Sequence, residues 1–305
     1  MELNTPIFIA AFNRPSCVRQ VLNVVRQVKT SCIYVCLDGP RPTVPGDYPL
    51  CLEVREIFDE LKRDRAVIFD VASANMGCGR RLSSGLTAFF SRFDRGIVLE
   101  DDTIPSLGFF RFCEGALEKY KQVDGIGHIA GSRFELAENG DVPARSIHPH
   151  IWGWATWARA WRHYDFSMSG YAQKNLRDAA RDFVDDPFIW RRWTDAFERV
   201  WCGKIDTWDY QWAFACWANR MEAIVPPVNL IRNVGFGADA THTKSGDGGI
   251  LGLQPKDLDH DISWTEASPR DHVSDRQVQL RRYGFMPDNS RAKILARRLW
   301  WRMSA

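Results

Sequence analysis

The chain has 305 residues, of which 45% are hydrophobic and 26% are charged, and its formal net charge is +2. This composition suits one large folded domain or two small ones. A net charge this close to zero gives no global field for nucleic acid, so we expect no nucleic-acid partner. No uninterrupted apolar run is long enough to span a bilayer.

The N-terminal sequence MELNTPIFIAAFNRP has a short apolar run but no basic region and no small-residue cleavage site. These features indicate a first strand rather than a signal peptide. The eight cysteines are scattered and match no zinc or thioredoxin pattern. We therefore expect reduced, mostly buried thiols and a cytoplasmic location.

Strands and helices are expected to alternate over the first hundred residues. Apolar runs typical of strands and apolar residues at helical spacing follow one another in turn. This alternation predicts a parallel sheet with right-handed crossovers. The strands are expected at 7–12, 33–37, 66–71 and 97–99, and the helices at 18–28, 54–61 and 82–90. The polar residues that follow the strands, and could reach a ligand at one sheet edge, are Arg14, Asp38, Asn75, Asp101 and Asp102.

The stretch GIVLEDDTIP, residues 96–105, places three adjacent carboxylates directly after an apolar strand. In open α/β sheets, ligands bind beyond the carboxyl ends of the strands. Because the like charges of Glu100, Asp101 and Asp102 repel one another, we expect a cation to hold them. Carboxylate oxygens suit Mg²⁺ or Mn²⁺. The alternative is a solvated acidic loop or a helix N-cap.

A glycine loop, NMGCGRR at 75–81, is neither a Walker loop nor a GxGxxG fingerprint. Its glycines could let the backbone approach a phosphate, with Arg80 or Arg81 countering the charge. A plain tight turn into a helix is the alternative.

The thirteen tryptophans all lie after residue 150, which suggests two halves with different tasks. Indole faces suit the apolar face of a sugar ring, but most of these rings are expected in the core, with one or two lining a cleft. The segment DTWDYQW at 206–212 opens a helix and places Asp209 in its first turn, where a capping role is the alternative. A later loop, GFGADATHT, carries His242.

The ordered series AFNRP, LDG, NMGCGRR, IVLEDD, GWATW, TWDYQW and GFG…THT resembles the nucleotide-sugar glycosyltransferases of the GT-A fold. It is most similar to bacterial family 2-type enzymes and the N-acetylglucosaminyltransferase I group. That group has an EDD metal motif before a Pro- and Phe-rich segment, as in EDDTIPSLGFFRF, and a Trp-Asp-Asp-Trp base motif that TWDYQW resembles. The match covers roughly residues 5–245.

The resemblance implies an α/β, Rossmann-like GT-A domain over 1–245 with a mostly parallel central sheet flanked by helices. The domain would divide into a nucleotide-binding half, 1–105, and an acceptor and catalytic half, 106–245. A C-terminal helical or irregular extension would follow over 246–305.

The resemblance also implies roles for single residues. Asp209 would be the catalytic base, Asp102 a metal ligand, and His242 a residue near the metal or diphosphate. Tyr210 stands where the relatives have a second Asp, so the base assignment depends on one carboxylate. Acceptor contacts would come from Trp154 and Trp208. Contacts to the nucleotide sugar would come from Arg14, Asp38, Asn75, Arg80 and Asp101.

The implied activity is metal-dependent, inverting transfer of a sugar from a nucleoside-diphosphate sugar, with UDP favoured, using Mn²⁺ or Mg²⁺. The acceptor would be a hydroxyl of a glycan or lipid-linked glycan in bacterial surface polysaccharide synthesis. A sugar-1-phosphate nucleotidyltransferase is one alternative, although AFNRP lacks the longer glycine-rich opening of that class. A non-catalytic nucleotide- or sugar-binding protein is the other.

The end of the chain, 289–305, combines basic residues with Trp300 and Trp301 and predicts a basic amphipathic helix. One interpretation is peripheral contact with the anionic inner membrane face, near a lipid-linked acceptor. The alternative is packing on its own domain or on a homodimer partner.

Overall fold

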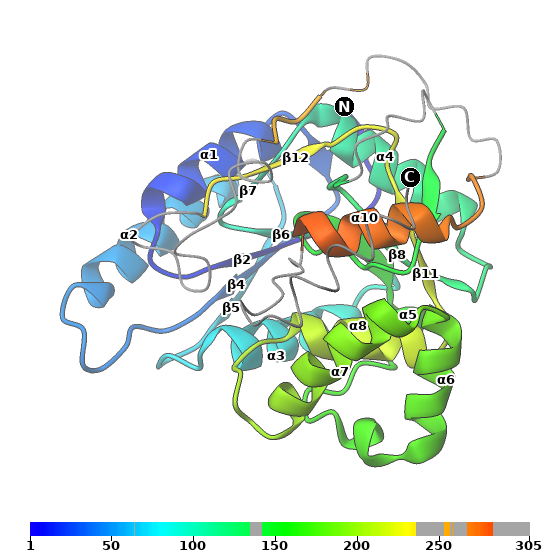
Figure 1. The fold of residues 1–305 in the computed structure, drawn as a ribbon. Coiled ribbons are helices and arrows are strands. Elements are labelled where there is room, and N and C mark those ends of the chain that lie inside the picture. Colours follow the sequence, from blue (N-terminus) through cyan, green and yellow to red (C-terminus); the bar gives the residue numbers. More distant parts are fainter. Residues whose placement is uncertain (64, 135–141, 236–252, 257, 259–266, 283–305) are drawn as a thin grey trace.

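The structure is a computed structural model that describes residues 1–63, 65–134, 142–235, 253–256, 258 and 267–282 (Figure 1). His242 and the predicted helix at 289–305 lie outside the described residues. Each helix within the described ranges is too short or too polar to cross a membrane.

A mixed eight-stranded sheet forms the centre of the molecule, in the order β5-β4-β2-β6-β10-β8-β11-β9. Its first four strands run parallel to one another, as the alternating sequence pattern predicted. Strand β10 runs antiparallel to both β6 and β8, and β9 runs antiparallel to β11 at the edge. The strands are β2 (Ile7–Ala11), β4 (Ile33–Leu37), β5 (Val67–Val71), β6 (Arg95–Glu100), β8 (Ile126–Ala130), β9 (Ala144–Ser146), β10 (Trp154–Trp157) and β11 (Glu222–Val225).

Two small sheets flank the large one. Strand β1 (Glu2–Leu3) pairs in parallel with β3 (Lys29–Thr30). Strand β12 (Ile231–Asn233) pairs antiparallel with β7 (Thr103–Pro105), which follows the carboxylate triplet directly. The β7–β12 pair therefore brings a late segment of the chain beside the end of β6.

Helices cover both faces of the sheet (Figure 1). Residues alternate along β2, so that Ile7 and Ile9 join one apolar core and Phe8 joins the other. The first core packs under α1 (Pro15–Val25), α2 (Asp47–Asp59) and α4 (Leu107–Lys119). The second packs under α3 (Cys78–Phe90), α5 (Ala158–Trp161), α6 (Lys174–Val184), α7 (Pro187–Trp201) and α8 (Asp209–Ala218). Short 3-10 turns lie at η1 (Glu60–Arg63) and η2 (Ser169–Ala172).

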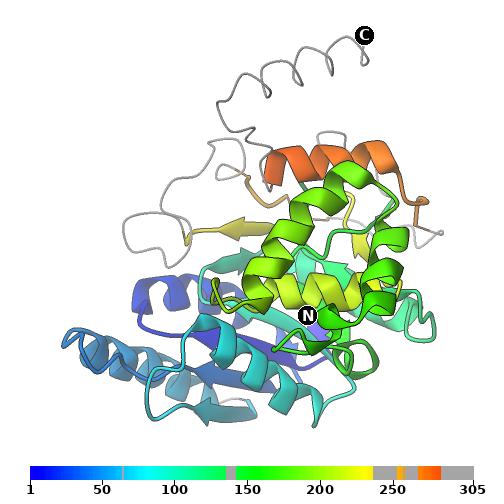
Figure 2. The same ribbon diagram turned by 60° about the horizontal axis from the view of Figure 1, so that its bottom comes forward.

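Helix α10 (His272–Arg282) lies beside α7 (Figure 2). The Trp193 indole donates a 2.7 Å hydrogen bond to Gln279 Oε1. Asp275 is fully buried and accepts hydrogen bonds from Ser146 Oγ (2.8 Å) and Arg270 Nε (2.7 Å). This described part of the C-terminal region is therefore docked firmly on the tryptophan-rich half.

Candidate active site

The carboxylate triplet lies at the carboxyl end of β6, in the middle of the sheet. Glu100 is the last residue of the strand, and the Thr103 hydroxyl closes the following turn by accepting a 2.9 Å hydrogen bond from the Glu100 N–H. Asp101 is buried, with 3% of its side chain exposed, whereas Asp102 is 16% exposed. Asp102 is therefore the more accessible of the two aspartates.

Arg14 bridges the two aspartates. It precedes Pro15 at the start of α1, and its guanidinium lies 2.9 Å from Asp102 Oδ2 and 3.3 Å from Asp101 Oδ2, with a further close contact to Asp101 Oδ1. Burial raises the pKa of Asp101 to about 6, although Arg14 opposes the shift. Burial and the charges of Asp102 and Asp101 raise the pKa of Glu100 well above its usual value. The single positive charge of Arg14 therefore does not balance the carboxylates of this acidic cluster.

A divalent cation fits this cluster only in combination with a ligand. Within the described ranges, no three Asp, Glu, His or Cys side chains are arranged to hold a metal by themselves. Mg²⁺ in phosphate-transfer sites is commonly held by one or two carboxylates together with substrate phosphates. Asp102 offers such a carboxylate, and Gly235, two residues after β12, packs closely against it, since a Cβ added there would collide with Asp102 Oδ2.

Asp38 and Asn75, which follow β4 and β5, bind each other. The Asn75 side-chain amide donates to Asp38 Oδ2 (3.0 Å) and to the Gly39 carbonyl (3.1 Å). Asp38 Oδ1 also accepts from the N–H groups of Gly39 and Met76, both at 2.8 Å. Burial raises the pKa of Asp38. The two loops are thus joined to each other, at the same edge of the sheet as the acidic cluster.

The two arginines of the glycine loop have different environments. Arg81 is buried and donates to the carbonyls of Leu37 (3.0 Å) and Asp70 (2.6 Å), and pairs with the Asp70 carboxylate (2.7 Å). Arg80 is exposed at the start of α3. Arg80 is therefore the one that can meet a ligand in solvent.

The glycines of this loop allow close packing against the segment that leads into α8. Gly77 has a φ of +80°, and a Cβ there would lie 2.8 Å from Asp206 Oδ2. A Cβ on Gly79 would lie 2.4 Å from Asp206 Oδ1 and 2.7 Å from the Thr207 carbonyl oxygen. Because Gly77 and Gly79 have no side chains, the start of α3 can pack directly against the segment that leads into α8.

Gly79→Ala is expected to lower the free energy of unfolding by about 1–3 kcal/mol, because backbone atoms of Thr207 cannot move aside cheaply. Alanine is otherwise the better helix former by about 1 kcal/mol. Gly125→Ala is the control, since a Cβ there meets nothing within 4 Å. Unfolding in urea should show a lower free energy of unfolding for Gly79→Ala than for Gly125→Ala. Equal free energies would show that the Thr207 backbone leaves room for a Cβ at residue 79.

Asp209 is the first residue of α8. Its Oδ1 accepts hydrogen bonds from the Thr207 hydroxyl and from the Tyr210 N–H (2.9 Å). The predicted position in the first helical turn is therefore correct. The Asp209 charge contributes to raising the pKa of Glu100 and of Cys78, although burial is the main cause for both. Asp209 therefore lies near enough to the end of β6 for its charge to act on Glu100.

Trp154 and Trp208, the predicted acceptor contacts, lie in the core. Their exposed fractions are 0% and 2%, and their rings stack with centroids 5.6 Å apart. Buried in this way, neither ring presents a face to an acceptor. Tryptophan composition alone could not distinguish these core rings from rings at a pocket.

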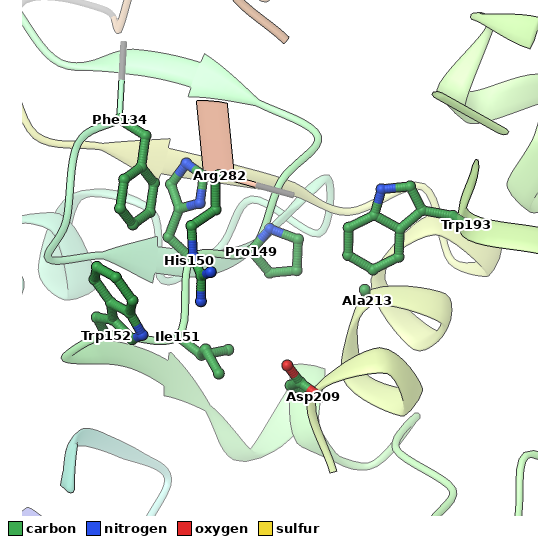
Figure 3. Close-up of a pocket in the computed structure, with 9 residues that line it drawn as sticks. All are labelled: Phe134, Pro149, His150, Ile151, Trp152, Trp193, Asp209, Ala213 and Arg282. Carbon is green, nitrogen blue, oxygen red and sulfur yellow. The ribbon is translucent and has the colours of Figure 1, made fainter. Parts of the chain in front are cut away.

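A pocket opens beside Asp209, between α7, α8, α10 and the segment before β10 (Figure 3). His150 and Arg282, which line this pocket, were not predicted from the sequence as site residues. The HPH spacing of His148 and His150 was the available signal, whereas nothing local linked Arg282 to Asp209. The lining consists of Phe134, Pro149, His150, Ile151, Trp152, Trp193, Asp209, Ala213 and Arg282.

Three histidines, His128, His148 and His150, are buried in this part of the molecule, and His150 lines the pocket. His128 accepts a hydrogen bond from the Trp212 indole (3.1 Å) on Nδ1, and its Nε2 is 2.9 Å from the His150 carbonyl oxygen. Burial lowers the pKa of His128 to about 3. His128 is therefore neutral at physiological pH.

We expect His128 to make stability depend on pH. An unfolded histidine binds a proton below about pH 6.5. The unfolded state thus binds more protons than the folded state between pH 6.5 and 3, so stability falls as pH falls through this window. Wild type should lose about 1.4 kcal/mol more per pH unit than His128→Gln. Urea unfolding between pH 6 and 4.5 measures the slopes, and equal slopes would contradict a neutral buried His128.

No protein-family model and no curated protein matches this sequence. Solved structures resemble it weakly. TarS residues 1–349 of S. aureus have 5% identity and a TM-score of 0.41, over 75% of this chain and 59% of that one. The mannosyltransferase PcManGT of Pyrobaculum calidifontis, in complex with GDP-Man and Mn²⁺, has 10% identity and a TM-score of 0.36. The match covers 72% of this chain and 74% of that one.

A UDP-glucose pyrophosphorylase complexed with UDP-glucose has 8% identity and a TM-score of 0.37, over 73% of this chain and 90% of that one. A protein named as a mannosyltransferase and one named as a pyrophosphorylase thus both occur among these structures. The chain spans 59% of the TarS structure. Similarity at this level carries no argument about which reaction this chain performs.

Proposed function

We propose that this chain is a metal-dependent, inverting glycosyltransferase that moves a sugar from a nucleoside-diphosphate sugar, with UDP favoured, to a hydroxyl of a glycan or lipid-linked glycan. The observation that supports it best is the single acidic region in which Asp209, at the start of α8, joins the Arg14-bridged aspartates at the end of β6. Such a transfer requires a cation-binding site and a general base close to each other.

The donor would bind along the edge formed by the loops after β2, β4 and β5. Arg14 and Arg80 carry positive charge at this edge, and Asp38 and Asn75 hold its shape through their mutual hydrogen bond. Asp101 keeps Arg14 in place from the buried side and would approach the ribose.

Asp102 would hold Mn²⁺ or Mg²⁺ together with the donor phosphates. The bound metal would stabilise the negative charge that develops on the departing diphosphate. His242, which follows β12 in the sequence, is proposed as a neighbour of the metal or diphosphate.

Asp209 would take the proton from the acceptor hydroxyl as its oxygen attacks the anomeric carbon. A single base on the face opposite the leaving diphosphate gives inversion. We also propose a role in surface polysaccharide synthesis in a bacterium, at a cytoplasmic location. The segment 289–305 would contact the inner membrane face or a homodimer partner.

The test begins with a thermal-shift panel of UDP-, dTDP-, GDP- and CMP-sugars, each with and without Mn²⁺. We expect one nucleotide class to stabilise the protein only with the metal. Release of the nucleoside diphosphate is then measured with and without glycan acceptors. Pyrophosphate release from a nucleoside triphosphate and a sugar-1-phosphate would instead identify a nucleotidyltransferase, and binding without any turnover would identify a binding protein.

A further inference from the structure

His150 lines the pocket that also contains Asp209. Its side chain is 1% exposed, and among the described residues neither ring nitrogen has a hydrogen-bond partner. Buried polar groups in proteins almost always have a partner. A side chain of this kind that lines a pocket therefore points to a polar group that binds there.

The imidazole of His150 is uncharged at neutral pH. Burial lowers its pKa well below the usual value, and the nearby charges of Arg282 and Arg133 act in the same direction. A neutral imidazole has one N–H donor and one acceptor nitrogen. The ring of Phe134 packs edge-on against it, with centroids 4.6 Å apart, and fixes its plane.

Arg282, the last described residue of α10, brings a positive charge to the same pocket (Figure 3). Its guanidinium lies 4.3 Å from the centre of the Trp152 ring, an arrangement typical of a cation–π contact. The docking of α10 through Gln279 and Asp275 holds this end of the helix in position. Figure 3 shows Asp209 across the pocket from these two groups.

The free space between these side chains is about that of one water molecule. The pocket thus admits one small polar group rather than a whole sugar ring. Arg282 offers donors, Asp209 offers an acceptor, and His150 offers one of each. A hydroxyl, with one donor hydrogen and two acceptor lone pairs, complements this set.

We propose that His150 and Arg282 bind the attacking hydroxyl of the acceptor and present it to Asp209. This inference rests on the proposed glycosyl transfer. The hydroxyl proton passes to the Asp209 carboxylate, the oxygen forms the new bond to the anomeric carbon, and the bond to the diphosphate breaks with its electron pair leaving on the diphosphate.

The first test is spectroscopic and needs no turnover. Protein labelled with ¹⁵N-histidine is titrated with a panel of methyl glycosides in the presence of Mg²⁺ and the nucleoside diphosphate found in the thermal-shift panel. The His150 signals are those that vanish in His150→Phe. We expect at least one glycoside to shift them, and no shift with any glycoside overturns the proposal.

The second test is kinetic. His150→Phe keeps an aromatic ring but removes both polar nitrogens, so it should lower kcat/KM for the acceptor by about 100-fold, the typical cost of a misplaced reactant. The donor dissociation constant should not change. Arg282→Gln should act in the same direction.

Matched controls separate positioning from folding. His148 is equally buried and lies 3.0 Å through Nε2 from the Asp275 carbonyl oxygen, outside the pocket lining. Arg276 lies on α10 outside the pocket lining and pairs with Asp186, the N-cap residue of α7. His148→Gln and Arg276→Gln should leave kcat/KM for the acceptor unchanged. If the control variants lower kcat/KM as much as His150→Phe and Arg282→Gln do, the proposal is wrong. If the wild type binds no nucleotide sugar at all, the proposed glycosyltransferase function itself is refuted.

Discussion

Asp209→Asn is expected to abolish sugar transfer while leaving nucleotide binding nearly intact. General-base catalysis contributes about 10²–10⁴-fold to rate, and an amide cannot accept the acceptor proton. The amide oxygen can still accept the hydrogen bonds from Thr207 and from the Tyr210 N–H, so the start of α8 should keep its shape. Transfer assays and a donor titration on the same preparation measure the two quantities.

Asp206→Asn is the matched control for this substitution. Asp206 is exposed, packs against Gly77 and Gly79, and does not line the pocket. Its transfer rate should remain close to that of wild type. An equal loss of binding and transfer in Asp209→Asn would show that Asp209 acts structurally, as a helix-capping residue.

Arg14→Gln is expected to lower the free energy of unfolding by about 3–5 kcal/mol, the usual cost of removing one partner of a buried ion pair. The loss leaves the carboxylates of Asp101 and Asp102 facing each other without a counter-charge. Without Arg14, both carboxylates become available to a cation, so millimolar Mn²⁺ should recover part of this stability even in the absence of donor phosphates.

Adding Asp102→Asn to Arg14→Gln should also recover stability, and should remove the effect of Mn²⁺. Arg26→Gln is the control, since its exposed pair with Glu60 is worth at most about 1 kcal/mol. Unfolding by urea, with and without Mn²⁺, measures all of these variants. Failure of Mn²⁺ to stabilise Arg14→Gln would argue against a metal at Asp102.

Much of the first half of the fold could be predicted, because its signals are local. The apolar runs of β2 and β4 and the helical spacing of α1 each lie within a dozen residues. Strand β10 was not predicted. Its sequence, WATW, is buried on both faces and has no alternation, so nothing local shows that it inserts between β6 and β8.

The candidate site was likewise predictable only where its signals are local. The sequence by itself determined that carboxylates follow the central strand and that Asp209 begins a helix, because strand ends and first helical turns are set by neighbouring residues. Only the tertiary structure decided that Arg14 neutralises Asp101, a residue 87 positions away. It also decided that Trp154 is core, and that Arg282 shares a pocket with His150 and Asp209. The physical reason is that burial and charge pairing depend on which distant surfaces pack together, and no local pattern encodes that choice.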